Sequence, residues 1–306
     1  MLLILTNSVD GTTDEIIRRL GKHPAFRFNV DLWRQYEFEF TPHGFFLRDP
    51  AGRTVREEDV SRLYVRKPNF DEPVDRPAGG SLEWWTQQQV SYLVREIYNL
   101  CKLHGKIALV EKGAENRLGK VSQMRLAARH FHVPPWRIVR QDCLDTSGTP
   151  QIAKSLVADF TGNYQFFFTR CVKPETLDPS YPWFLQDLID AEADVTVVYV
   201  AGRQFAFELD RASFSGVDWR KHINAVNLVW KRVQLPDEVA NGIGKFMSEA
   251  GLSFGRLDFL RAQNQHFFLE VNPNGQWAWL DMEGKEGIFD WVIECLASND
   301  VGLKQE

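Results

Sequence analysis

Two acidic residues and an amide near the carboxyl end of the chain have the spacing of a metal site. Asp258 lies in one β-like apolar run, and Glu270 and Asn272 lie in the next, across a short polar turn near Asn264. The two runs predict a β-hairpin in which Asp258 stands opposite Glu270. Because side chains alternate along a strand, Phe268 and Asn272 are expected to share the face of Glu270.

Directly opposed carboxylates repel by about 0.2–1 kcal/mol, so a cation is expected between them. Asp258, Glu270 and Asn272 offer only hard oxygen ligands. Such ligands suit Mg²⁺, especially Mg²⁺ shared with the phosphates of a nucleotide. A register shifted by one residue would instead leave both acids on a solvated face, and the spacing alone leaves both interpretations open.

The composition is that of a globular protein with room for two or three subdomains, with 306 residues, 44% hydrophobic and 25% charged. A net charge of -5 argues against a nucleic-acid binder, because phosphate recognition relies on clustered Lys and Arg. No apolar run approaches the roughly 18–20 residues that span a bilayer, and the scattered cysteines form no CxxC pair. We therefore expect a cytoplasmic protein with no nucleic-acid or membrane partner.

Two kinds of periodicity divide the chain into regions. The apolar run Leu2–Leu5, followed by helical spacing, predicts an α/β opening, and Ser81 is expected to cap a long helix that ends near His104. From Ile138 onward, short β-like runs alternate with turns, which predicts one antiparallel sheet built from hairpins. A helix over Asp237–Ala250 then precedes the hairpin that carries the acids.

The continuation of that hairpin carries a specific resemblance. Phe268-Leu-Glu-Val-Asn-Pro-Asn-Gly-Gln-Trp-Ala-Trp279 resembles the metal-binding strand and following loop of ATP-grasp ligases. Its Gly-Gln-Trp extension is similar to the branch that matures microviridin-like peptides, the graspetides. The run Tyr64-Val-Arg-Lys-Pro68 resembles the pre-ATP-grasp domain of that family.

The resemblance implies an α/β protein with the ATP-grasp fold. A Rossmann-like pre-ATP-grasp domain is expected over residues 1–108. Two α+β subdomains, over 109–189 and 190–306, are expected to clamp the nucleotide between them.

The resemblance also implies nucleotide-binding residues. Lys120 and Lys154 fall where the two phosphate-contacting lysines of the family are expected, although a solvated surface lysine is the simpler interpretation of each residue alone. Gly162 and Asn163 fall in the loop that would close over the phosphates. The adenine contacts are expected in the linker between the subdomains, at Gln186, Asp187, Leu188 and Ile189.

Arg220 is the expected catalytic arginine, together with Lys154. Asp218-Trp-Arg220 is similar to an Asp-Trp-Arg element of the family, in which the arginine would face the phosphates or the acyl phosphate; a structural ion pair is the alternative. The family usually carries a further arginine on the strand after the linker, and the stretch 192–198 has none. Arg203 or Arg220 is expected to supply that charge.

The function implied by the resemblance is an ATP- and Mg²⁺-dependent ligase that forms ADP and phosphate. It would join Asp or Glu side chains of a ribosomal precursor peptide, held by its leader and core, to Ser, Thr or Lys side chains through an acyl phosphate. A homodimer is expected on the same ground. Two alternatives stay open: a ligase for amino acids or dipeptides, and an inactive nucleotide- or peptide-binding protein, which the missing arginine favours.

Overall fold

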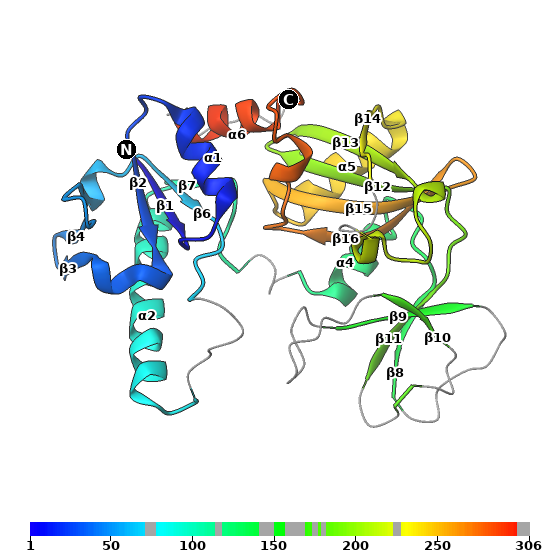
Figure 1. The fold of residues 1–306 in the computed structure, drawn as a ribbon, viewed down its shortest axis with the longest axis horizontal. Coiled ribbons are helices and arrows are strands. Elements are labelled where there is room, and N and C mark those ends of the chain that lie inside the picture. Colours follow the sequence, from blue (N-terminus) through cyan, green and yellow to red (C-terminus); the bar gives the residue numbers. More distant parts are fainter. Residues whose placement is uncertain are drawn as a thin grey trace.

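A computed structural model of the chain describes residues 1–70, 78–113, 118–140, 150–156, 169–172, 177–178, 182–222 and 228–298. Three regions carry the sheets of this part of the chain (Figure 1). The predicted Gly162 and Asn163 lie outside the described residues.

The amino-terminal region is built on a parallel sheet with strand order β2-β1-β6-β7. One face of β1 packs against α1, and the other face packs against α2. Burial on both faces explains why the predicted first strand is a continuous apolar run. The long helix begins at its predicted cap, where the Ser81 hydroxyl accepts a hydrogen bond from the Trp84 N–H. The elements are β1 (Leu2–Thr6), α1 (Gly11–Leu20), β2 (Ala25–Asn29), β6 (Arg62–Val65), α2 (Leu82–Leu103) and β7 (Ile107–Ala108).

A small antiparallel sheet of three strands adjoins the parallel sheet and α2. It shares a hydrophobic core with the helix and with the parallel sheet. Two 3₁₀ turns, η1 (Val30–Gln35) and η2 (Glu57–Asp59), flank its strands, which are β3 (Glu37–Thr41), β4 (Gly44–Arg48) and β5 (Thr54–Arg56).

The β-rich part beyond residue 135 forms two antiparallel sheets, so the prediction of one sheet is wrong. The smaller sheet has the order β10-β9-β11-β8 and stands apart at the lower right of Figure 1. The first two residues of the segment predicted to contact adenine, Gln186 and Asp187, end its strand β11. Its strands are β8 (Trp136–Val139), β9 (Gln151–Lys154), β10 (Arg170–Val172) and β11 (Trp183–Asp187).

The larger sheet has five antiparallel strands in the order β14-β13-β12-β15-β16. One face is covered by α4 and α5, through core residues that include Val197, Phe246 and Phe268. On the opposite face, Val198 and Val200 reach a core shared with the amino-terminal region. The elements are α4 (Lys120–Ala127), β12 (Ala193–Val200), β13 (Arg203–Asp210), β14 (Lys231–Val233), α5 (Asp237–Glu249), β15 (Phe254–Ala262) and β16 (Gln265–Asn272), with η5 (Arg211–Ser213) and η6 (Trp219–His222) between β13 and β14.

The shared core joins the two ends of the chain. The last helix, α6 (Ile288–Ala297), follows the short turn η7 (Ala278–Leu280) and packs between α1 and the five-stranded sheet (Figure 1). Trp277 and Phe289 meet there in full burial, with ring centroids 4.6 Å apart. Within the described ranges, no helix has both the length and the apolar character that a bilayer crossing requires.

Candidate active site

A cavity of about 950 Å³ lies where the three regions meet. Its wall includes Lys67 from the amino-terminal region, Lys154 from the small sheet, and Asp258 with Glu270 from the five-stranded sheet. This volume is within the range of small-molecule sites. Most of the predicted site residues that the structure describes line this cavity, namely Lys120, Lys154, Gln186, Asp187, Leu188, Ile189, Arg220, Asp258, Glu270 and Asn272.

The predicted pairing of Asp258 with Glu270 is confirmed, but a β-bulge produces it. The turn residues Gln263 and Asn264 have positive φ, and regular pairing from that turn would place Asp258 opposite Leu269. A register shift between Asp258 and Phe259 inserts one extra residue on β16 and brings Glu270 into place.

Because of the same bulge, the side chains of β16 face differently from the prediction. Phe268 is fully buried in the core with Val271, whereas Glu270 and Asn272 line the cavity. The expectation that Phe268 shares the face of Glu270 is therefore wrong. The extra residue switches the alternation between Phe268 and Glu270.

Asp258 is held by two neighbours that the sequence did not identify. Thr196 stands opposite it on β12, and the Thr196 hydroxyl donates to Asp258 Oδ1 at 2.8 Å. Arg256, two residues earlier on the same strand face, donates from Nη2 to Asp258 Oδ2 at 2.9 Å. The alternation of side chains along β12 could have identified Thr196. Every second residue shares one face of a strand, and this face carries Asp194 in the cavity wall and Val198 and Val200 in the shared core, with Thr196 between them.

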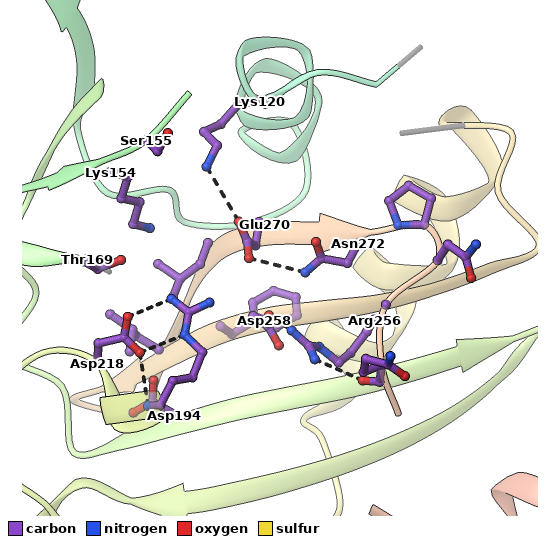
Figure 2. A pocket seen from close by; sticks show the side chains of 18 of the residues that line it. Lys120, Lys154, Ser155, Thr169, Asp194, Asp218, Arg256, Asp258, Glu270 and Asn272 are labelled. Carbon is purple, nitrogen blue, oxygen red and sulfur yellow. Dashed lines mark hydrogen bonds and ion pairs between the residues drawn. The ribbon is translucent and has the colours of Figure 1, made fainter. Parts of the chain in front are cut away.

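Glu270 lies among cations. The Lys120 ammonium at the start of α4 approaches its carboxylate at 3.9 Å, and the Asn272 amide donates to Glu270 Oε1 at 3.3 Å (Figure 2). Burial would raise the pKa of Glu270, but Lys120 and Lys154, with Asn272 and Arg220, outweigh burial and lower that pKa. Glu270 is therefore an anion at neutral pH.

The donor chemistry of this group fits Mg²⁺. Within the described residues no set of three or more His, Cys, Asp and Glu side chains is placed to hold a metal ion. Two carboxylates and one amide oxygen would leave coordination positions for phosphate oxygens and water, which is how Mg²⁺ binds beside nucleotides. The assignment of Asp258, Glu270 and Asn272 as ligands stays a prediction that this arrangement allows.

Lys154 points into the cavity from the small sheet (Figure 2). Its ammonium donates to Gln186 Oε1 at 2.8 Å across the β9–β11 pair. Burial lowers the pKa of Lys154 to about 8, with Lys120 and Arg220 also lowering it and Glu270 opposing them. The amide nitrogen of Gln186 is buried with no partner among the described residues, so its N–H groups are available to a ligand.

The predicted adenine segment forms the edge of the cavity beyond Gln186. Leu188 continues from β11 and is fixed by a backbone hydrogen bond from its N–H to the Pro150 carbonyl at 2.9 Å. Ile152 lines the cavity from the paired strand β9. Apolar walls beside backbone polar groups suit a flat heterocyclic base.

Arg220 lines the cavity and also forms an ion pair, so both features considered for it from the sequence are present. Its Nε and Nη2 donate to the two carboxylate oxygens of Asp218 at 2.8 and 2.7 Å. This fork-to-fork contact raises the pKa of Arg220 and fixes its plane. The Arg220 side chain remains about half exposed, so it retains donors for a second anion.

Arg211, which begins η5, is a further arginine of the cavity wall that the sequence did not identify. It lines the cavity and donates to Asp194 Oδ2 at 2.9 Å. Burial raises the pKa of Asp194 to about 6, against the opposing effect of Arg211. Arg203 does not line the cavity: it is exposed, with its guanidinium 3.6 Å from the Trp291 ring centroid. Of the two predicted substitutes, only Arg220 therefore reaches the site.

No protein-family model and no curated protein matches this chain. Solved structures do. The macrocyclase MdnC of Microcystis aeruginosa MRC, solved with its precursor peptide MdnA, superposes with a TM-score of 0.79 at 20% identity over 96% of this chain and 98% of that chain. A RiPP-associated ATP-grasp ligase of Chryseobacterium gregarium, solved with ADP and a leader and core peptide, gives 0.80 at 19% identity over 96% of both chains.

A third solved structure, the ATP-grasp ligase PsnB with a minimal precursor, gives a TM-score of 0.76 at 13% identity over 97% of this chain and 98% of that chain. At identities of 13–20%, these superpositions show a shared fold and nothing beyond it. The superpositions cover nearly the full length of all three proteins. The chain therefore has the ATP-grasp fold expected from its sequence.

Proposed function

We propose that this protein is an ATP-dependent carboxylate ligase that cyclises a ribosomal precursor peptide. It would join Asp or Glu side chains to Ser, Thr or Lys side chains. One observation carries the proposal: three cations, Lys120, Lys154 and Arg220, line one cavity with the opposed pair Asp258 and Glu270. The proteins of similar fold described above include a macrocyclase and a ligase solved with precursor peptides, which supports the peptide as substrate.

The chemistry follows from the weak electrophilicity of a carboxylate. A substrate carboxylate oxygen bonds to the γ-phosphorus of ATP as the bond to the β–γ bridging oxygen breaks, and ADP leaves with that electron pair. A hydroxyl or amine then attacks the acyl carbon, its proton passes to solvent, and phosphate leaves with the C–O electron pair. Lys120, Lys154 and Arg220 would neutralise charge on the transferring phosphoryl group.

Asp258, Glu270 and Asn272 would hold Mg²⁺, which would supply further positive charge to the phosphate oxygens. PsnB has been solved with Mg and ADP, which supports this cofactor pair. The backbone of Gln186, Asp187, Leu188 and Ile189 would bind adenine, and Gly162 with Asn163 would cover the phosphates. The homodimer stays a prediction that sedimentation velocity would test.

A second candidate function is a small-molecule ligase. The D-cycloserine synthetase DcsG is similar in structure, with a TM-score of 0.55 at 14% identity over 97% of this chain and 98% of that chain. The peptide ligases superpose better over the same length. We therefore rank the peptide substrate first.

Measurement of ADP release separates these functions. The protein would be incubated with ATP and Mg²⁺, alone, with amino acids and dipeptides, and with the short peptide encoded beside its gene. ADP formed only with the peptide supports the proposal, and ADP formed with amino acids alone supports the small-molecule ligase. No ADP under any condition would point to an inactive binding protein. Glu270→Gln should abolish release, and Glu58→Gln, at an exposed position, should not.

A further inference from the structure

The cavity contains a second group of cations, on the amino-terminal side. Lys67 lines the cavity two residues after the end of β6, and Arg66 and Arg256 lie close enough to lower its pKa. The charges that act on Lys154 are a different set, namely Glu270, Lys120, Arg220 and Asp258. The two groups meet where Arg256 binds Asp258. A nucleotide held by the first group would leave Lys67 available for another anion.

The backbone presents Lys67 in a fixed and uncommon conformation. Its φ is 49°, in the left-handed region, and the next residue is Pro68, which further restricts it. The Lys67 carbonyl accepts hydrogen bonds from Asn7 Nδ2 at 3.1 Å and from the Asn69 N–H at 2.8 Å. Such strain outside glycine is typical of positions that bind ligands.

The ammonium of Lys67 has no carboxylate partner in the part of the chain that the structure describes. The acid that raises its pKa is Asp10, whose Oδ2 already accepts from the Thr6 and Thr13 hydroxyls at 2.9 and 2.6 Å. Burial, with Arg66 and Arg256, lowers the pKa of Lys67 to about 8. An incoming anion would stabilise this charge.

Arg66 adds positive charge behind the cavity wall. Its guanidinium is fully buried and donates to neutral oxygens, the Asn274 carbonyl at 2.7 Å and Gln276 Oε1 at 2.6 Å. Arg256 donates to the Gln276 carbonyl at 3.0 Å. The loop at 274–276 is thereby fixed against the carboxylate strand, and the positive charge of Arg66 is not cancelled by these bonds.

We propose that Lys67, supported by Arg66 and Arg256, binds the carboxylate of the substrate side chain that is to be phosphorylated. The inference rests on the proposed function and names the substrate-binding residue of that site. The phosphates would then be bound by the group of Lys154, and the substrate carboxylate by the group of Lys67, within the same cavity. The ligand class is an Asp or Glu side chain of a peptide.

Steady-state kinetics with the peptide encoded beside the gene test this assignment. Lys67→Met should lower kcat/KM for the peptide by about tenfold to a hundredfold, the loss expected for a charged hydrogen bond. KM for ATP should stay within twofold, and Lys67→Arg should recover part of the loss. Lys245→Met, at an exposed position of α5, is the matched control. A rise in KM for ATP with unchanged peptide kinetics would assign Lys67 to the nucleotide and overturn the proposal, as would unchanged kinetics for both substrates.

Chemical labelling of the unmodified protein gives an answer that does not depend on the variant folding. Acetylation of Lys67, followed by peptide mass mapping, should slow several-fold when the peptide is present. It should not slow with Mg-ADP, or with a peptide whose Asp and Glu residues are replaced by Asn and Gln. Equal protection by either control overturns the proposal. If the wild-type protein forms no ADP with the peptide, the proposed function fails first and independently of Lys67.

Discussion

At the scale of single residues, the charged side chains of the site are held in position by hydrogen bonds from neighbouring side chains. Thr196 is one such neighbour, 2% exposed and bonded to Asp258 Oδ1 at 2.8 Å. Thr196→Val keeps the shape and removes this bond, so Asp258 loses part of its orientation. We expect the Mg²⁺ concentration for half-maximal ADP formation to rise by about tenfold. Thr54→Val, on an exposed strand position, should leave it unchanged, and an unchanged requirement in Thr196→Val would argue against Asp258 as a ligand.

The pKa of Lys154 predicts how activity depends on pH. Its pKa is about 8, so the lysine loses its positive charge as the pH rises through 8, and kcat/KM for ATP should fall over that interval. In Gln186→Glu a carboxylate would stand 2.8 Å from the ammonium and raise the pKa of Lys154. The falling limb should then move to higher pH. A pH profile that is identical in Gln186→Glu would show that Lys154 does not control it.

The sequence was informative for some of these residues and not for others. The alternating pattern predicted a hairpin with Asp258 opposite Glu270, but its turn was centred on Asn264, half a residue from the observed Gln263–Asn264 turn, and the unpredicted bulge compensates for that difference. It did not predict Arg211, in η5, or Arg256, on β15, since an arginine can pair with any nearby acid. Only the three-dimensional arrangement distinguishes Arg211, which lines the cavity, from Arg203, which does not.

At the scale of elements, the loop after β16 depends on a glycine. A Cβ at Gly275 would lie 2.9 Å from Arg256 Cβ and 3.0 Å from Asn272 Cβ, so one of these cavity residues must move. We expect Gly275→Ala to lower kcat/KM at least tenfold and stability by about 1–3 kcal/mol. The control is Gly244→Ala in α5, where a Cβ meets nothing within 4 Å and should stabilise the helix. Activity equal to wild type in Gly275→Ala would contradict a rigid loop.

The elements themselves were largely predictable, and the exceptions have physical causes. The long helix from Ser81 and the acidic hairpin follow from periodicity and caps. The bulge in β16 was not predicted, because a single extra residue leaves the apolar composition unchanged. The pattern predicts one sheet where the structure has two, because strand periodicity identifies strands without showing which of them pair.

At the scale of the whole molecule, the two ends of the chain are joined through the core that α6 shares with α1. Phe289 is fully buried there, against Trp277 and beneath the Arg19 guanidinium at 4.5 Å. Phe289→Ala should lower the free energy of unfolding by about 3–5 kcal/mol, with the amino-terminal and five-stranded regions unfolding together. Denaturant titration with hydrogen exchange would measure both, and Glu294→Ala, exposed on α6, should change little. Loss of protection in α6 alone would contradict a shared core.

This joining is the part of the fold that the sequence could not supply. The apolar face of α6 predicts burial but not its partner, and Leu2 and Ile4 are more than 280 residues away. The expected ATP-grasp fold is confirmed by the superpositions. The boundaries at 108 and 189 stay predictions, and α6 lies in the last segment while packing on the first.

The most direct test of the account is the mass of the peptide encoded beside the gene after incubation with the protein, ATP and Mg²⁺. Each ring closure by a carboxylate ligase removes one water, so the account predicts a peptide lighter by one or more waters, with ADP formed in step. Glu270→Gln should leave the mass unchanged. An unchanged peptide with the wild-type protein, under conditions where ADP accumulates, would contradict peptide cyclisation and assign the site to another carboxylate.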